Sequence, residues 1–177
     1  RILENRKVDG IIVSRPEANG NIEKMLIDNN MPFVVIGRSV NTESIAVDSE
    51  HLGGCKALTS YLLMSNKPDK IGLLLGSTEY TVNKSRYMGF MSAFEAAGVL
   101  PEEKLIYTGI DTPMQFSKAI AMLLQQKPRC IICGDDMICM KVIAELGEQG
   151  LHIPADIRVA SFYDSAYLDH YVPPITS

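Results

Sequence analysis

Two acidic side chains directly follow an apolar run in the last third of the chain. Asp135 and Asp136 come after residues 130–133, which read Cys-Ile-Ile-Cys and are typical of a buried strand. The next apolar run ends in Phe162, Tyr163 and Asp164. In an open α/β sheet, small molecules bind outside the carboxyl ends of the parallel strands. These side chains therefore predict a small-molecule site where the two strands end.

The two carboxylates have different predicted roles. Asp136 is expected to be the N-cap of the helix that follows, because an aspartate oxygen there accepts a backbone N–H of the first turn. Asp135 then faces the cleft, where its carboxylate can accept hydrogen bonds from two neighbouring sugar hydroxyls. The alternative is that both carboxylates hold Mg²⁺ through their oxygens. The sequence offers no third carboxylate at a suitable spacing and no phosphate loop, so we expect neither a metal nor a cofactor.

Arg86 is a candidate ligand contact from an earlier helix. The sequence places it in the first turn of a helix that Asn83 is expected to cap, after the apolar run 71–75. A guanidinium offers rigidly arranged donors and a helix N-terminus adds positive partial charge, which together suit a polar or anionic ligand. The alternative is a surface arginine paired with a glutamate. Gly89, one turn later, permits close approach of a backbone or ligand and otherwise costs about 1 kcal/mol in a helix.

Aromatic residues beside the strand ends add apolar surface to this region. Tyr80, Phe162 and Tyr163 can pack on the apolar face of a sugar ring, with the phenols as hydrogen-bonding groups. Phe162 could equally belong to the core, and Asp164 could cap the segment after it. No motif pairs a histidine with a nucleophile, so the sequence does not predict an enzyme.

Composition and charge exclude several classes of protein. The chain has 177 residues, a formal net charge of −4 and a pI of about 5.4. No run holds more than two adjacent basic residues, so this stretch is a poor DNA binder by itself. No segment reaches the roughly 18 apolar residues of a membrane span, and no secretory signal opens the chain. We expect a cytoplasmic protein that is not in a membrane.

Two of the four cysteines form a C-x-x-C. Cys130 and Cys133 at this spacing could bind zinc or carry redox chemistry. Both lie in an apolar run, no histidine is near and no second pair exists. Packing as small hydrophobic side chains is therefore favoured, and reduced cysteines fit the cytoplasm.

Strand and helix patterns alternate along the chain. Strand-like apolar runs lie at 10–13, 33–36, 45–47, 71–75, 105–107, 130–133 and 158–162. One helix start is well marked, with Thr112 as cap, Pro113 at the first position and Gln115 at the third. The alternation predicts an α/β fold with parallel sheets flanked by helices. Residues 1–47 are expected to form part of an N-terminal lobe, and residues 48–177 most of a C-terminal lobe.

The order and spacing of several stretches resembles the effector-binding domain of the LacI/GalR family of bacterial transcription regulators. These stretches are 8–12, 32–38, 47–57, 71–76, 86–98, 128–136, 150–157 and 173–177. The resemblance implies two flavodoxin-like lobes of the periplasmic-binding-protein-like type I, with a small ligand, often a sugar, between them. The family's DNA-binding headpiece and pieces of the lobes are absent from this sequence, so the fold is expected to be incomplete at both ends.

The resemblance also assigns site residues. Arg86 lies in an R-x-x-G-F motif and takes the place of the family's ligand-binding arginine. Asp135 takes the place of a frequent asparagine. Tyr163 stands where relatives often carry a ligand-contacting aspartate, so either Tyr163 stacks on a ring or Asp164 reaches in from the next position. Arg38, after a strand of the first lobe, is a further candidate.

Three functional hypotheses follow from these patterns. The first is the sensor domain of a dimeric repressor that couples a sugar to operator DNA binding through a headpiece, with a protein corepressor as a further partner. The stretch 162–165 is similar to maltose-type regulators and favours a glucose-containing disaccharide. The second is a periplasmic-type sugar-binding protein for transport, against which four unpaired cysteines count. The third is an α/β enzyme that uses Asp135 and Asp136 with a metal.

Overall fold

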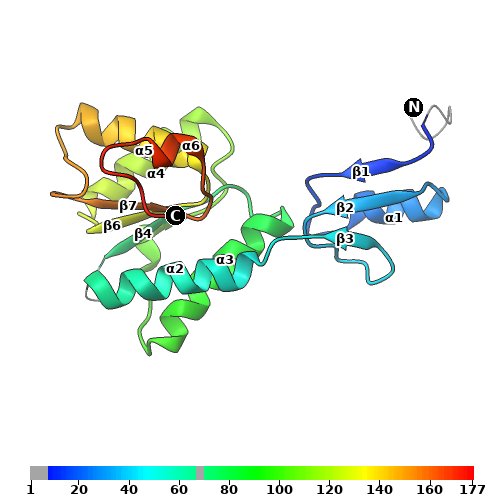
Figure 1. Cartoon of the computed structure of the whole chain (residues 1–177). Coiled ribbons are helices and arrows are strands. Elements are labelled where there is room, and N and C mark those ends of the chain that lie inside the picture. The colour runs from blue at the N-terminus through cyan, green and yellow to red at the C-terminus, as the bar shows by residue number, and fades with distance from the viewer. Residues whose placement is uncertain (1–7, 67–69) are drawn as a thin grey trace.

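The computed structural model describes residues 8–66 and 70–177, which form two parallel β-sheets with flanking helices (Figure 1). The smaller sheet has the strand order β1-β2-β3, and the larger has the order β5-β4-β6-β7. The elements in chain order are β1 (Ile11–Val13), α1 (Asn21–Asp28), β2 (Phe33–Ile36), β3 (Ile45–Val47), α2 (His51–Asn66), β4 (Ile71–Leu74), α3 (Thr81–Ala96), the short 3-10 helix η1 (Glu103–Leu105), β5 (Ile106–Tyr107), α4 (Pro113–Gln125), β6 (Cys130–Cys133), α5 (Asp136–Glu148), β7 (Arg158–Ser161) and α6 (Ala166–Asp169). The predicted α/β class with parallel sheets flanked by helices is confirmed.

The smaller sheet is covered on one face by α1. Leu26 of that helix packs on Val13 and Val35, and these three side chains are the buried core of the unit. Side chains that alternate with the core positions, Ile12 and Ile36 among them, are exposed on the other face. Because strand side chains alternate between faces, one covered face gives this pattern of buried and exposed positions.

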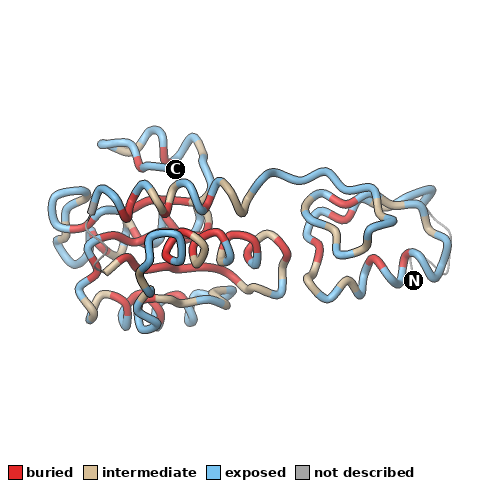
Figure 2. The backbone as a smooth tube through the Cα atoms, turned by 90° about the horizontal axis from the view of Figure 1, so that it is seen from below, coloured by how far each residue is buried: buried red, intermediate tan, exposed pale blue. Residues whose placement is uncertain are grey.

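The larger sheet is covered on both faces, which explains its uninterrupted apolar strands. Leu74 and Ile131 point into a core formed with α4, α5 and α6, and Leu73 and Ile132 point into a core formed with α2 and α3. Figure 2 shows buried backbone concentrated in this larger unit. The sheet and its two helical layers hold the ends of β4, β6 and β7 in fixed positions.

Helix starts decide where the candidate site residues lie. The predicted capping box is confirmed at α4, where the Thr112 hydroxyl accepts from the Gln115 backbone N–H and Pro113 opens the helix. The prediction that Asn83 caps α3 is wrong, because α3 begins at Thr81 after the extended Tyr80. The Asn83 side chain instead donates to the Ser77 carbonyl at 3.0 Å. This hydrogen bond from Asn83 of α3 holds the loop before the helix in place.

The two units meet where the loops after β1 and β4 touch. Glu17 and Tyr80 form an antiparallel bridge between these loops. The Thr81 N–H donates to the Pro16 carbonyl at 3.1 Å, and the Ala18 N–H donates to the Glu79 carbonyl. The chain also crosses between the units from β3 to α2 (Figure 1). The carboxyl ends of β1 and β4 therefore face each other.

In the described ranges, no helix combines the length and apolar character that a bilayer crossing needs.

Candidate ligand-binding site

Arg86 lies in the second turn of α3, one turn later than the sequence predicted. The helix dipole acts mainly within the first turn of a helix, so the early start of α3 weakens its effect on this side chain. The surroundings of Arg86 are instead made by α2, by the loop between β6 and α5, and by the loop after β7. These three segments come from distant parts of the sequence.

The Arg86 side chain is buried, and its Nε lacks a hydrogen bond to the described residues. It is only 6% exposed, and its Nε has no hydrogen-bond partner within the described part of the chain. No carboxylate of the described residues lies within 4 Å of its guanidinium as an ion-pair partner. A buried charge without partners is costly, and groups of this kind occur where a ligand supplies the missing hydrogen bonds. Arg86 is therefore the centre of the candidate site.

Burial lowers the pKa of Arg86, and the surrounding groups oppose this shift. Cys55, Asp135, Tyr163 and Asp136 each act to raise that pKa, in this order of size. Asp135 and Tyr163 thus lie close enough to Arg86 to affect its pKa. Two carboxylates and a phenol near one guanidinium form a polar cluster that can both donate to and accept from hydroxyl groups.

His51 belongs to the same cluster and was not selected from the sequence. Its pKa is lowered by burial first and by the positive charge of Arg86 second, while Asp48 and Glu50 act to raise it. Its Nε2 lies 3.4 Å from Asp48 Oδ1 at the start of α2. The histidine is thus held at the crossing from the smaller to the larger unit, beside the guanidinium.

Gly89 brings α2 and α3 together and so places His51 and Cys55 near Arg86. A Cβ at position 89 would lie 2.4 Å from the Leu52 carbonyl oxygen and 2.8 Å from Cys55 Cβ. Such distances exclude a larger side chain unless the helices separate. The sequence left open whether this glycine admits a backbone or a ligand, and the structure shows the backbone of α2 against it.

Asp135 caps α5, which corrects the predicted roles of the two aspartates. Asp135 is extended, and its Oδ1 accepts the Ile138 N–H at 2.8 Å. The prediction that Asp136 is the cap is wrong, because Asp136 is already the first helical residue. The cap uses only Oδ1 of Asp135. Its Oδ2 makes no hydrogen bond among the described residues.

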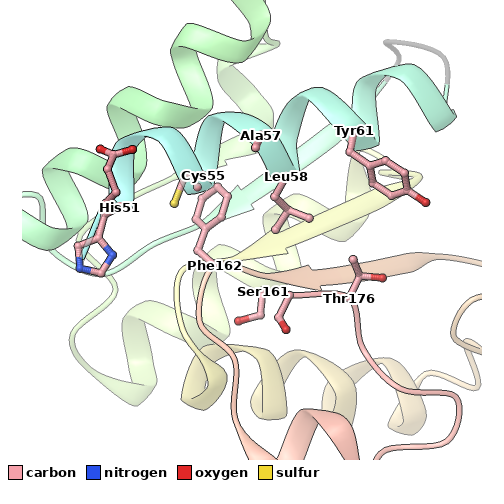
Figure 3. A pocket seen from close by; sticks show the side chains of 11 residues that line it. His51, Cys55, Ala57, Leu58, Tyr61, Ser161, Phe162 and Thr176 are labelled. Atoms are coloured by element: carbon pink, nitrogen blue, oxygen red, sulfur yellow. The ribbon is translucent and has the colours of Figure 1, made fainter.

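A cavity of about 520 Å³ lies beside this cluster, between α2 and β7 (Figure 3). His51 and Cys55, which both interact electrostatically with Arg86, line one end of it, and Tyr61 lies at the other end of the same helix. Phe162 projects into the space between the helix and the strand and also packs against the core on this side of the sheet. The structure thus shows the core packing of Phe162, and its contact with a ligand stays a prediction.

The remaining sequence-predicted residues are spread around the joint of the two units. Tyr163 is 51% exposed, and Asp164 is exposed beyond it. Asp164 does not cap α6, since Ser165 holds the N-cap position. The Tyr80 ring lies under the Arg15 guanidinium, with 4.0 Å between the Arg15 Cζ and the ring centroid.

Arg38 lies apart from the Arg86 cluster. It is exposed and lines a separate cavity with residues of α3.

The cysteines are free thiols inside the larger unit. Burial raises the pKa of Cys130 to about 12 and holds that of Cys133 well above its usual range. Thiols in such surroundings are poor nucleophiles and poor metal ligands. Within residues 8–66 and 70–177, no three His, Cys, Asp or Glu side chains gather as a metal site would require.

Comparison with known proteins agrees with this architecture. A family profile described as "Periplasmic binding protein-like domain" matches residues 62–177, about two thirds of the chain. The chain belongs to the periplasmic-binding-protein-like domains of LacI-family transcriptional regulators. The resemblance stated from the sequence is thereby confirmed at the level of the family.

Curated relatives include two repressors. The chain is 30% identical over 179 residues to the HTH-type transcriptional repressor PurR of Glaesserella parasuis, covering 99% of this chain and 52% of that protein. It is 28% identical over 180 residues to PurR of Actinobacillus pleuropneumoniae, covering 99% and 53%. The chain thus spans about half the length of the curated relatives it matches. These relatives are repressors rather than enzymes, in agreement with the prediction that the chain is not an enzyme.

Solved structures show the same fold. A putative LacI transcriptional regulator from Bacillus cereus subsp. cytotoxis matches with a TM-score of 0.88 and 25% identity, over 98% of this chain and 63% of that one. The complex of the transcriptional regulator CelR with cellobiose matches with a TM-score of 0.84 and 24% identity, over 98% and 54%. The match to CelR, at 24% identity, supports a shared fold only.

Proposed function

We propose that this chain is the effector-sensing part of a LacI-family repressor and that it binds a small sugar at the Arg86 cluster. One observation carries the proposal. Among the described residues, the buried Arg86 donates no hydrogen bond from its Nε and forms no ion pair. A ligand rich in hydroxyl groups supplies hydrogen-bond acceptors for the Arg86 guanidinium, whose Nε lacks one among the described residues.

The ligand contacts that we propose come from four segments. Arg86 donates to ligand oxygens, Asp135 accepts through its uncapped oxygen, and Tyr163 or Asp164 contacts the ligand from the loop after β7. Phe162 and Tyr80 supply aromatic surface, the latter from the start of α3. A glucose-containing disaccharide of the maltose type fits the sequence of the loop after β7. The cavity of about 520 Å³ that His51, Cys55 and Phe162 line has a volume that admits two rings.

Sensing requires that the ligand favour one arrangement of the two lobes over another. We assign residues 1–47 to part of one lobe and residues 48–177 to most of the other. Two backbone hydrogen bonds, between Thr81 and Pro16 and between Ala18 and Glu79, join the lobes beside the site. A ligand that contacts both lobes and binds one arrangement more tightly increases the population of that arrangement. The arrangement of the lobes in turn sets the spacing of attached DNA-binding headpieces.

The partners follow from the family and stay part of the proposal. They are a sugar effector, operator DNA contacted through a headpiece, a second copy of the protein in a homodimer, and in some regulators a protein corepressor. The net charge of −4 agrees with DNA contact through a separate basic segment rather than through this chain. The cytoplasm is the proposed location.

A thermal-shift screen tests the proposal. The protein is heated with maltose, cellobiose, glucose, phosphorylated sugars and purine bases in turn. A ligand at one hundred times its Kd stabilises the native state by about 2.7 kcal/mol, which is a rise of roughly 5–10 °C for a chain of this size. We expect such a rise with a disaccharide.

Variants of Arg86 separate binding at this site from binding elsewhere. Arg86→Met removes the donors, and the rise should disappear. Lys24→Met, which removes an exposed cation of α1, is the matched control and should keep it. A rise that survives in Arg86→Met would refute the assignment of the site. A rise with purine bases alone would refute a sugar as the ligand.

A further inference from the structure

A second cavity lies at the joint of the two units, on the far side of α3 from the Arg86 guanidinium. Its volume is about 260 Å³. It is lined from the smaller unit by Ala18, Arg38 and Val40, and from α3 by Thr81, Lys84, Ser85 and Met88. Successive helical residues are rotated by about 100°, so positions 81, 84, 85 and 88 share one face that lies opposite position 86. The cavity is therefore separate from the candidate sugar site.

Two cations line this cavity from opposite sides. Arg38 comes from the segment after β2, and Lys84 comes from the first turn of α3. No carboxylate of the described chain is ion-paired with either of them. The start of the 16-residue helix α3 adds positive partial charge, and no side chain of the described residues caps it. The electrostatics of the cavity favour an anion.

Thr81 contributes a buried hydroxyl without a hydrogen bond to the described residues. The residue is 4% exposed, and its Oγ1 has no hydrogen bond within the described ranges. This oxygen faces the segment after β2, at 3.9 Å from the position that a Cβ on Gly37 would take. A buried hydroxyl without a partner is costly, and an anion oxygen is an acceptor that satisfies it.

We propose that this cavity binds a phosphate group, either free phosphate or the phosphate of a small phosphorylated metabolite. A tetrahedral group with several acceptor oxygens can meet Arg38, Lys84 and the Thr81 hydroxyl at once, which a single carboxylate does less well. Because Arg38 and Lys84 belong to different units, the bound anion ties the smaller unit to α3. The site does not depend on the identity of the sugar at Arg86.

Calorimetric titration of the full protein with inorganic phosphate at constant ionic strength tests the proposal. Phosphate should bind, and Arg38→Met, Lys84→Met and Thr81→Val should each weaken it, the two cation variants by at least about tenfold. Lys56→Met removes an exposed lysine of α2 outside the cavity and should bind as the unchanged protein does. Arg38 and Lys84 are exposed, and equal melting temperatures of their variants and Lys56→Met show that folding is unaffected.

Two further titrations separate the sources of the phosphate. One titrates glucose 6-phosphate, and the other glucose as its control, into the protein with phosphate bound. If glucose 6-phosphate displaces phosphate and binds more tightly, while glucose does not displace it, the natural ligand is a phosphorylated metabolite. Equal affinities of glucose 6-phosphate and phosphate indicate free phosphate. The proposal is overturned if phosphate gives no binding, or if both cation variants bind it as tightly as Lys56→Met does.

Discussion

Gly89→Ala should destabilise the protein although alanine is the better helix former. The substituted Cβ would lie 2.4 Å from the Leu52 carbonyl oxygen, 2.8 Å from Cys55 Cβ and 3.0 Å from the Lys56 nitrogen. The first and third of these atoms belong to the backbone of α2, so no side-chain rotation can relieve the contact. The two helices must separate, by up to about 1 Å if an ordinary contact is to be restored.

The expected magnitude combines two opposing effects. Overpacking of a rigid contact costs about 3 kcal/mol, the upper end of the usual range, because the blocking atoms are backbone atoms. Replacement of glycine by alanine inside a helix returns about 1 kcal/mol. The net loss in the free energy of unfolding is about 2 kcal/mol, or a fall in Tm of roughly 4–8 °C.

Two other helical glycines are matched controls. Gly54 in α2 and Gly147 in α5 have open space where a Cβ would stand, and neither has a positive φ. Gly54→Ala and Gly147→Ala should therefore raise the free energy of unfolding by about 0.5–1 kcal/mol. Chemical denaturation of the three variants measures all three effects. If Gly89→Ala proves as stabilising as Gly147→Ala, the helices α2 and α3 are not packed as described.

Three further predictions concern a helix cap, a histidine and a buried thiol. Asp135→Ala should lower the free energy of unfolding by about 1 kcal/mol. Asp135→Asn should lower it much less, since asparagine caps a helix as well as aspartate does. Equal losses for the two variants in urea denaturation would contradict the hydrogen bond from the Ile138 N–H to Asp135. The pKa of His51 is lowered in the folded protein, so the unfolded chain binds the proton more readily and stability should fall as the pH drops below about 6.5. Denaturation curves between pH 7.5 and 5.5 should show a smaller pH dependence in His51→Gln, and an unchanged one would refute this assignment. Burial raises the pKa of Cys130 to about 12, so mass spectrometry should find this thiol unmodified by iodoacetamide in the native protein and modified in the denatured one; rapid native modification would show that the strand is open.

Local signals in the sequence were enough for most of the elements. The runs around Ile131 and Leu73 are apolar throughout because both faces of the larger sheet are covered, and length and flanking residues identify them as strands. The capping box at Thr112 was predictable because all of its parts lie within four residues. These features depend on neighbours in the sequence and need no knowledge of distant contacts.

The helix starts were less predictable, and two of them change the site. Asp135 and Asp136 are chemically equal caps, and only the backbone turn after β6 decides that α5 begins at the second of them. In α3 the Thr81 N–H bonds to Pro16 of the other unit, a long-range contact that extends the helix upstream of Asn83. Helix propensity alone does not predict such a contact, because it depends on local residues only.

The composition of the candidate site was predictable only in part. The sequence selected Arg86, and the structure adds that its side chain is buried with an unbonded Nε among the described residues. His51 was missed because it reaches Arg86 through the close packing at Gly89, which joins residues far apart in the chain. Arg38 lies with Lys84 rather than with Arg86, which depends on how the segment after β2 meets α3.

The most direct test of the central claim observes the Arg86 side chain itself. The Nε–H resonance of Arg86, assigned by its absence in Arg86→Lys, is followed by NMR while the ligand found by thermal shift is added. A ligand that completes the hydrogen bonds of this buried guanidinium should shift that resonance in step with saturation, and Arg86→Lys should bind at least about tenfold more weakly. A resonance that stays in place while the protein becomes saturated would contradict the proposal that Arg86 holds the effector.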